Sequence, residues 1–249
     1  MSGHSKWSQI KRDKGVNDVK RGAIFTKMGR EIAVAARAGG GDPDGNFRLR
    51  LAIEKARAAN MPIDTIKRAV EKATGGGEGE QYEEIVYEGY GPGGVALLVE
   101  AATDNRNRTV SDIRHVFSKN GGNMGEQGSV AWMFDRRSQV LVPVEKAGED
   151  QLMGVILDAG GDDLRAAGDN WEVLSPPEAH DAILKALEAA GIATSEASIA
   201  MVPKNLIKLE GKSASGMLRL YEALEDHDDV QNVYSNFDID EKELEALGQ

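Results

Sequence analysis

A glycine-rich, acidic segment at residues 75–81 separates two stretches of sequence whose apolar residues repeat with different periods. Before this segment, apolar residues recur every three or four positions, which is the spacing of a helix that buries one face. After it, short continuous apolar runs alternate with helical spacings, as in strands mixed with helices. The segment itself has the composition of a linker. The sequence therefore predicts an α+β, multi-domain protein that begins with a helical bundle.

Three helices are predicted before the linker. The first begins at Asn17 or Asp18, both good N-cap residues, and ends before Gly39. Pro62 breaks the helical pattern, and Asp64 can cap the third helix. The loop at 39–45 is longer than the turn of a helix-turn-helix motif, so we predict a small bundle without a recognised DNA-reading motif. The predicted ranges are 17 or 18 to 38, about 44 to 59 and about 64 to 74.

Beyond the linker, the apolar runs at 95–99 and 130–134 are predicted strands on either side of a helix at 107–120. Residues 136–205 then follow the order β-α-β-β-α-β, which is the ferredoxin-like arrangement. A helix at 214–224 and a strand at 230–237 form only half of another unit. We therefore expect residues 230–234 to pair beside 95–99 or 130–134.

This pattern predicts two ferredoxin-like α+β domains, one inserted in the other. The predicted division is 1–77 for a basic arm and helical domain, 78–135 plus 206–249 for a discontinuous domain, and 136–205 for the inserted domain.

Charge is distributed unevenly along the chain. The net charge of −11 combines +8 in residues 1–75, from 16 Lys/Arg and 8 Asp/Glu, with −19 in residues 76–249, from 14 and 33. A strong difference in sign within one chain indicates that its parts have different partners. The basic part can attract the phosphates of a nucleic acid.

A set of basic residues in the first helix and the preceding arm is the candidate nucleic-acid-binding site. Four of them recur within a sector of about 100° beside the apolar stripe of the first helix, which makes one face cationic. The alternative is an ordinary amphipathic helix with a solvated face. Trp7 could stack on a base, or it could pack back onto the helices. The candidate residues are Lys6, Trp7, Lys11, Arg12, Lys14, Lys20, Arg21, Lys27, Arg30 and Arg37.

The other helices of this part carry further basic residues. These cations are predicted to face away from the apolar side of their helices, but they are not among the candidates above. They are Arg48, Arg50, Lys55 and Arg57 in the second helix and Lys67, Arg68 and Lys72 in the third.

The sequence contains no recognisable catalytic motif. There is no cysteine, which excludes thiolate catalysis and thiolate zinc sites, and the four histidines do not follow a metal-ligand spacing. Gly91-Pro92-Gly93-Gly94 precedes a strand, whereas phosphate loops follow one. We therefore expect that the protein is not an enzyme and that it has no catalytic residue, metal site, cofactor or small-molecule substrate.

Two polar clusters have alternative interpretations. In the cluster at 103–109, two arginines near a helix start could hold a phosphate. The preferred interpretation is structural: Asp104 and Asn105 cap the helix and the arginines pair with nearby acids. The acidic run at 225–229 could attract a divalent cation, but a solvated helix end is the preferred interpretation.

The chain resembles the YebC family along essentially its whole length, most specifically in residues 3–134. The residues that carry the resemblance are GHSKW at 3–7, KRG at 20–22, FTK at 25–27, GGGDP at 39–43, YEGYGPGG at 87–94, TDNRNRT at 103–109, FSKNGGN at 117–123 and GSV at 128–130. The resemblance implies a helical domain and two α+β domains in a cytoplasmic, DNA-binding transcriptional regulator. It also implies a second possibility, because some relatives, including mitochondrial ones, resemble translation factors that act on ribosomes.

Four functions are therefore compared. A DNA-binding transcriptional regulator comes first because of the resemblance, although no clear base-reading helix is present. A ribosome-associated translation factor is the alternative, since folded RNA is recognised by shape and stacking. A protein-interaction module and an undetected enzyme follow. The N-terminus lacks the apolar region of a secretory signal, and no run of apolar residues is long enough to cross a bilayer. A cytoplasmic location without a membrane partner is therefore expected.

Overall fold

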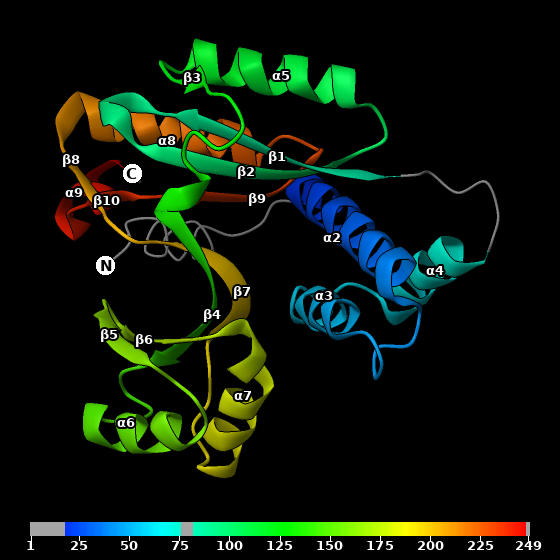
Figure 1. The fold of residues 1–249 in the computed structure, drawn as a ribbon, viewed down its shortest axis with the longest axis vertical. Coiled ribbons are helices and arrows are strands. Elements are labelled where there is room, and N and C mark those ends of the chain that lie inside the picture. The colour runs from blue at the N-terminus through cyan, green and yellow to red at the C-terminus, as the bar shows by residue number, and fades with distance from the viewer. Residues whose placement is uncertain (1–17, 76–81, 248–249) are drawn as a thin grey trace.

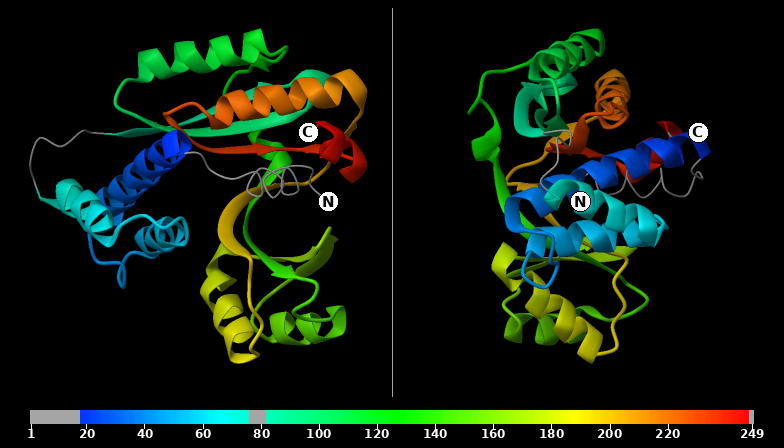
Figure 2. Two further views of the ribbon diagram at one scale, coloured as in Figure 1. Left: turned by 180° about the vertical axis from the view of Figure 1, so that it is seen from behind. Right: turned by 90° about the vertical axis from the view of Figure 1, so that its right-hand side faces the viewer.

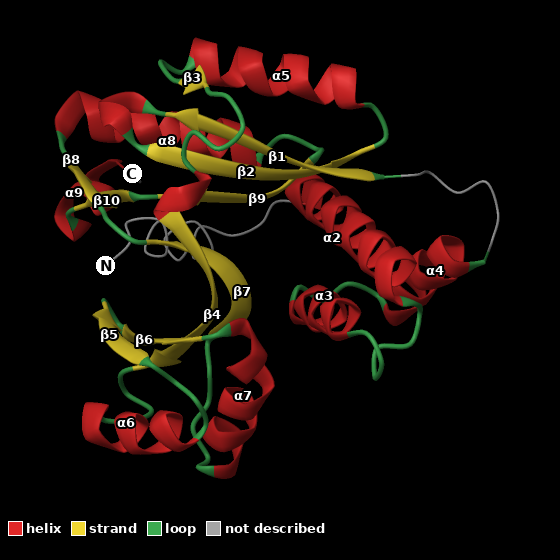
Figure 3. Cartoon of the chain, viewed as in Figure 1, coloured by secondary structure: helices red, strands yellow, loops and turns green. Residues whose placement is uncertain are grey.

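The computed structural model describes residues 18–75 and 82–247 of the 249-residue chain. A helical domain without strands precedes two antiparallel sheets that carry helices (Figures 1 and 3). The fold class is therefore as predicted, with a helical region followed by α+β units.

The helical domain consists of one long helix that packs against two shorter ones. Its core contains Ile32 and Ala35 from the first helix, Leu49 and Ala56 from the second, and Ile66 from the third. These residues follow the helical spacing of the sequence, so burial of one stripe per helix stabilises the domain. The helices are α2 (Asp18–Gly39), α3 (Phe47–Ala58) and α4 (Ile63–Thr74).

The α3 helix begins three residues later than predicted because Asn46 is its N-cap. The Asn46 side chain accepts a hydrogen bond from the Leu49 amide at 3.1 Å and donates to the carbonyls of Ala35 and Gly40, each at 2.8 Å. One buried amide thus caps α3 and fastens it to the end of α2. The predicted cap of α4 was also wrong: Pro62 occupies the N-cap position and Asp64 lies inside the first turn.

The first sheet, called the central sheet, has the strand order β3-β1-β2-β9 with every neighbouring pair antiparallel. Two helices, α5 and α8, cover one of its faces (Figure 2), and their apolar residues Phe117, Met217 and Tyr221 pack with Leu97 and other strand residues. The elements are β1 (Glu83–Tyr90), η1 (Pro92–Gly94), β2 (Ala96–Thr103), α5 (Arg106–Lys119), β3 (Asn123–Met124), α8 (Gly211–Glu225) and β9 (Val230–Ser235).

The β9 strand pairs with β2, with Leu97 opposite Ser235 and Val99 opposite Val233. This confirms the first of the two pairings that were expected for residues 230–234. The central sheet is thus built from segments more than 120 residues apart in the chain. The domain boundaries drawn from the sequence remain a prediction.

The second sheet, called the distal sheet, has the order β5-β6-β4-β7. Its elements follow the predicted β-α-β-β-α-β sequence, and α6 and α7 pack on it through Leu152, Ile156, Ile183 and Leu187. They are β4 (Phe134–Pro143), α6 (Glu149–Asp158), β5 (Asp163–Ala167), β6 (Asn170–Ser175), η3 (Pro177–Ala179), α7 (His180–Ala189) and β7 (Glu196–Pro203). A small parallel pair and a last helix follow: β8 (Ile207–Leu209), β10 (Phe237–Ile239) and α9 (Glu241–Leu247).

The strand predicted at 130–134 was wrong. Residues Ala131–Met133 form a 3-10 turn, η2, and the strand β4 begins only at Phe134. The cause is Glu88, whose buried carboxylate accepts hydrogen bonds from the amides of Val130 and Ala131. These amides are therefore not available to a neighbouring strand.

Gly89 is required where β1 passes close to α5 and β3. A Cβ atom at this position would lie 2.6 Å from the Phe117 ring and 2.8 Å from the Asn123 carbonyl oxygen. We expect Gly89→Ala to lower the free energy of unfolding by about 1–3 kcal/mol, as measured by urea denaturation. Gly154→Ala in α6 is the control, because nothing lies within 4 Å of its added Cβ. That variant should gain up to about 1 kcal/mol, and equal effects in both variants would contradict the packing argument.

Candidate nucleic-acid interface

The ten candidate residues divide into three groups in the structure. Lys6, Trp7, Lys11, Arg12 and Lys14 lie outside the described residues, and the side chains of Lys20 and Arg21 in α2 are also outside them. Lys27 and Arg30 face the central sheet. Arg37 lies in the last turn of α2 and is exposed.

Lys27 and Arg30 fasten α2 to the central sheet. The Lys27 ammonium donates a hydrogen bond to the Glu225 carbonyl at the end of α8. The Arg30 guanidinium donates to the carbonyls of Ala102 (3.2 Å) and Asp228 (2.7 Å) and lies 3.0 Å from the Asp229 carboxylate. The Arg30 side chain is only 12% exposed. These two cations therefore hold the helical domain against the acidic part of the chain that follows the linker, which is called the acidic body.

Asp229 is the centre of this junction. Its carboxylate, 4% exposed, accepts hydrogen bonds from Arg108 at 2.9 Å and from Thr109 at 2.7 Å as well as from Arg30. Burial raises the pKa of Asp229, but the hydrogen bonds from Thr109 and Arg108 and the nearby charges outweigh it, so the pKa lies below its ordinary value. The carboxylate is ionised at neutral pH.

The polar cluster at 103–109 has a structural role, as was preferred from the sequence, but Asp104 pairs with Arg108 and does not cap the helix. The Asn105 side chain caps α5 by accepting a hydrogen bond from the Arg108 amide at 3.1 Å. Arg108 pairs with Asp104 at 2.8 Å as well as with Asp229, and Arg106 lies 3.6 Å from Glu83. Both arginines are thus engaged with carboxylates.

Two arginines of α3 make further contacts between the helical domain and the sheets. Arg48 bridges Glu31 of α2, at 2.9 Å, and Glu84 of β1, at 2.5 Å. Arg50 pairs with Asp181 of α7 at 2.7 Å. Ion pairs therefore attach the helical domain to β1 of the central sheet and to α7, which packs on the distal sheet.

A contact between rings accompanies the attachment to the distal sheet. The Phe47 ring meets the fully buried His180 edge to face, with centroids 6.0 Å apart. His180 Nδ1 lies 2.7 Å from the Ser138 hydroxyl, and burial lowers the pKa of this imidazole. A neutral, buried histidine with these neighbours is part of the packing between the domains.

Among the residues of the helical domain whose side chains the structure describes, the exposed cations lie mainly on α3 and α4. None of these cations was among the sequence candidates except Arg37, because the regular spacing of cations in α2 was the stronger signal. The signal for α4 was its contrast between one apolar side, with Ile66 buried, and one polar side. The exposed cations are Arg37, Lys55, Arg57, Lys67, Arg68 and Lys72.

The connection between α3 and α4 consists of four residues, Ala59 to Pro62. This length is typical of the turn in a helix-turn-helix motif, whereas the α2–α3 loop is longer. Asn60 within the turn has a φ of 62°, a conformation that asparagine tolerates better than most residues. The turn therefore leads directly into α4, the helix with the exposed Lys67, Arg68 and Lys72.

The described residues show neither a metal-binding cluster nor a membrane-spanning helix. They contain no group of three or more His, Asp or Glu side chains placed to hold a metal ion. None of their helices combines the length and the apolar character that crossing a bilayer requires.

The fold and this surface define a class of protein in which a cationic helical domain is fastened by ion pairs to an acidic body of two antiparallel sheets. Residues 5–76 match the TACO1/YebC protein N-terminal domain, and residues 82–237 match the TACO1/YebC second and third domain. The chain belongs to the TACO1/YebC family.

Relatives over the full length have names that describe regulation. The chain is 70% identical over 249 residues to a "probable transcriptional regulatory protein" of Solibacter usitatus, with 100% of both chains covered. It is 58% identical over 243 residues to a protein of the same name from Acidobacterium capsulatum, with 98% of each covered. The crystal structure of a conserved hypothetical protein from Aquifex aeolicus is similar, with a TM-score of 0.81, 43% identity, and coverage of 90% of this chain and 93% of that one.

Proposed function

We propose that this protein is a nucleic-acid-binding regulator that acts as a DNA-binding transcriptional regulator through its helical domain. The observation that carries the proposal is a group of three exposed cations on α4, which lie on the solvent side of the helix together with Asp64 and Glu71 and follow a four-residue turn. A helix in this position can enter the major groove while its neighbours contact the backbone. The names of the relatives support a regulatory role.

The structure changes which side chains are the best candidates for phosphate contact. Lys27 and Arg30 are engaged with the central sheet, so the proposal relies on the exposed cations of α3 and α4 and on the basic residues before α2. Each phosphate contact releases counterions, and binding should therefore weaken steeply with salt.

A ribosome-associated translation factor is the alternative, and one feature of α4 favours it. The sequence of this helix, IDTIKRAVEKAT, contains neither asparagine nor glutamine. These are the side chains that read adenine by paired hydrogen bonds in the major groove. The lysines and arginine of α4 can pair with guanine, but they also bind backbone phosphates, and phosphate contacts suit folded RNA as well as DNA.

We expect the combined substitution of Lys67, Arg68 and Lys72 by glutamine to weaken binding to a mixed-sequence DNA duplex. Loss of three phosphate contacts should make the slope of log K against log salt shallower by about 2–3. Fluorescence anisotropy at a series of salt concentrations measures this slope. The matched control replaces Lys146, Arg165 and Lys185 by glutamine in the distal unit, which consists of the distal sheet and its helices. An equal effect in the control would contradict the assignment of DNA binding to α4.

A competition experiment separates the two functions. Labelled full-length protein is offered purified ribosomes together with an excess of mixed duplex DNA at near-physiological salt. Transfer to the DNA, lost in the α4 variant, supports the transcriptional regulator. Retention on ribosomes despite the DNA, lost in the same variant, supports the translation factor and contradicts the DNA proposal.

A further inference from the structure

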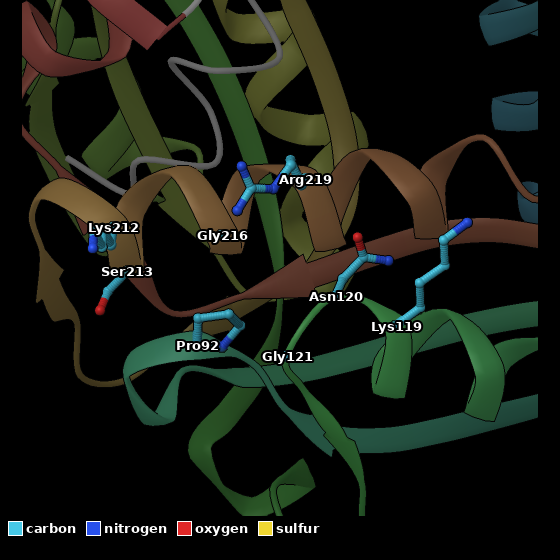
Figure 4. A pocket seen from close by; sticks show the side chains of 8 residues that line it. All are labelled: Pro92, Lys119, Asn120, Gly121, Lys212, Ser213, Gly216 and Arg219. Carbon is cyan, nitrogen blue, oxygen red and sulfur yellow. The ribbon is translucent and has the colours of Figure 1, made fainter.

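An open pocket of about 400 Å³ lies between the end of α5 and the side of α8, on the helical side of the central sheet. Lys212 and Arg219 lie on α8, and Lys119 lies at the end of α5 (Figure 4). The turn that holds Pro92 lies nearer to Lys212 than to Lys119 in this view. The lining residues include these three cations and no carboxylate. They are Pro92, Lys119, Asn120, Gly121, Lys212, Ser213, Gly216 and Arg219.

The three cations of this pocket differ in their pairing from seven of the fourteen Lys and Arg residues of the acidic body. Within the part of the chain that the structure describes, none of the three forms a salt bridge. By contrast, seven Lys and Arg residues of the same body do so: Arg106, Arg108, Arg137, Lys146, Arg165, Lys204 and Lys208. Residues 76–249 contain 33 Asp/Glu and only 14 Lys/Arg, so acidic partners are abundant. A pocket lined by three exposed cations and no carboxylate can attract an anion within an otherwise acidic body.

The walls of the pocket are suited to the close approach of a ligand. Gly216 is buried against Pro92, and a Cβ atom at Gly216 would lie 3.3 Å from the Pro92 ring, so this glycine lets α8 pack closely on the turn that holds Pro92. Gly121 adopts a φ of 76°, which favours glycine and leaves this wall without a side chain. Part of the pocket wall is therefore formed by small residues and a proline ring, which leave the backbone accessible.

The chemistry of the lining indicates which ligand fits. No aromatic ring lines the pocket, so a base has nothing to stack on, and a nucleotide pocket would need such apolar walls. Lys212 and Arg219 are seven residues apart on one helix, or roughly 10 Å along its axis. A DNA strand rises 3.4 Å per phosphate along the duplex axis, so cations separated by this length along that axis would match phosphates about three steps apart. Charge and spacing thus suit a backbone of several phosphates.

We propose that Lys119, Lys212 and Arg219 form a second nucleic-acid contact, which binds backbone phosphates independently of base sequence. The inference rests on the proposed function, because it extends the nucleic-acid interface from the helical domain to the central sheet. It assigns to the acidic body a direct role in binding. The ligand chemistry is a phosphodiester backbone, which either DNA or RNA can supply.

Lysine footprinting of the full-length protein tests both contacts at once. An amine-reactive acetylating reagent is applied with and without a short DNA duplex, a single-stranded RNA of equal length, or inorganic phosphate, and mass spectrometry gives the rate at each lysine. With nucleic acid at ten times its dissociation constant, acetylation of Lys119 and Lys212 should slow roughly tenfold. Lys146 and Lys185 of the distal unit should not change, and Lys55 and Lys67 report on the helical domain.

Each pattern of protection has a defined meaning. Protection of Lys119 and Lys212 supports the inference, and the arm that protects them identifies DNA or RNA. Protection of Lys55 and Lys67 alone overturns the inference and leaves the proposed function intact. Protection of the pocket lysines alone supports the inference and contradicts the assignment to α4. Protection by inorganic phosphate but by neither nucleic acid overturns the inference in favour of a small-anion site.

Substitution of the three cations gives a second measurement. The variant with glutamine at Lys119, Lys212 and Arg219 should have a slope of log K against log salt that is shallower by about 2–3. The control with glutamine at Lys146, Arg165 and Lys185 removes the same charge from the distal unit and should leave the slope unchanged. Equal slopes in the pocket variant and the wild type overturn the inference.

Discussion

Asp229→Ala is expected to lower the free energy of unfolding by about 3–5 kcal/mol, because it leaves the mostly buried Arg30 guanidinium without its carboxylate. The same substitution removes the acceptor of the Thr109 hydroxyl at 2.7 Å and one partner of Arg108. Arg108 is partly exposed and can be solvated, whereas Arg30 cannot without separation of α2 from the central sheet. The loss therefore falls mainly on the junction between the helical domain and the body.

The expected consequence is that the helical domain unfolds separately from the sheets. Urea denaturation followed by circular dichroism should give two transitions in the variant, and hydrogen exchange should become faster in α2. Asp228→Ala is the matched control: Asp228 is exposed, and Arg30 binds its backbone carbonyl, which the substitution retains. A single transition with wild-type stability in Asp229→Ala would contradict the role of this carboxylate.

The pH dependence of this junction follows from the lowered pKa of Asp229. A carboxyl whose folded pKa lies below its unfolded value of about 3.9 stabilises the protein fully above that value. This stability is lost as the pH falls through the folded pKa. Lowering the pH below about 4 should therefore reduce the free energy of unfolding of the wild type more than that of Asp229→Asn, which lacks the titrating group.

The sequence predicted the helices well because their apolar stripes are local. Ile32 and Ala35 of α2 are buried as their spacing requires, and the three helices lie close to the predicted ranges. The errors occur at the ends of the helices, where a single capping side chain can determine at which residue the helix begins. Asn46 caps α3 through contacts with residues that are adjacent only after α2 has packed.

The candidate site was harder to predict because pairing partners are distant in sequence. A regular row of cations on α2 is compatible with phosphate binding or with an acidic surface of the same protein. The partners of Lys27 and Arg30 lie 198 and 199 residues further along the chain, so no spacing in the sequence reveals them. The pocket could not be predicted for the same reason, since Lys119 and Lys212 line one pocket only because α5 packs beside α8.

The turn η2 shows how one buried carboxylate overrides an apolar pattern. The run Val130 to Phe134 has the composition of a strand, and nothing near it in the sequence argues otherwise. Glu88, more than 40 residues earlier, captures its amides and forms a 3-10 turn instead. Local propensity is a weak guide where a long-range hydrogen bond competes with it.

Glu88→Gln is expected to lower the free energy of unfolding by about 3 kcal/mol or more. The carboxylate is 4% exposed and accepts hydrogen bonds from the amides of Gly128 (2.6 Å), Val130 (2.7 Å) and Ala131 (2.8 Å). Glutamine replaces one acceptor oxygen by a donor, so that at least one of these three amides faces another N–H. An unsatisfied buried donor costs about 1–3 kcal/mol, and displacement of the turn adds to this.

The effect should extend to the path from the central to the distal sheet, because β4 starts immediately after η2. The indole of Trp132 donates to the Ser129 carbonyl at 3.1 Å, as does the Tyr90 hydroxyl at 3.0 Å, so the turn positions an exposed tryptophan. We therefore expect the fluorescence of Trp132 to change in Glu88→Gln and hydrogen exchange at residues 128–133 to become faster. The substitution Trp171→Phe, introduced into both the wild type and Glu88→Gln, removes one of the two other tryptophans from the fluorescence signal.

Burial raises the pKa of Glu88, but the three amide hydrogen bonds together outweigh it, and the pKa lies below its ordinary value. The wild type should therefore lose this contribution as the pH falls below about 4.3, whereas Glu88→Gln should show a flatter acid limb. Glu126→Gln in the neighbouring loop removes an exposed carboxylate and is the control. If Glu126→Gln and Glu88→Gln have equal stability and equal acid sensitivity, the buried carboxylate does not hold the turn, and the connection to the distal sheet is maintained by its apolar contacts alone.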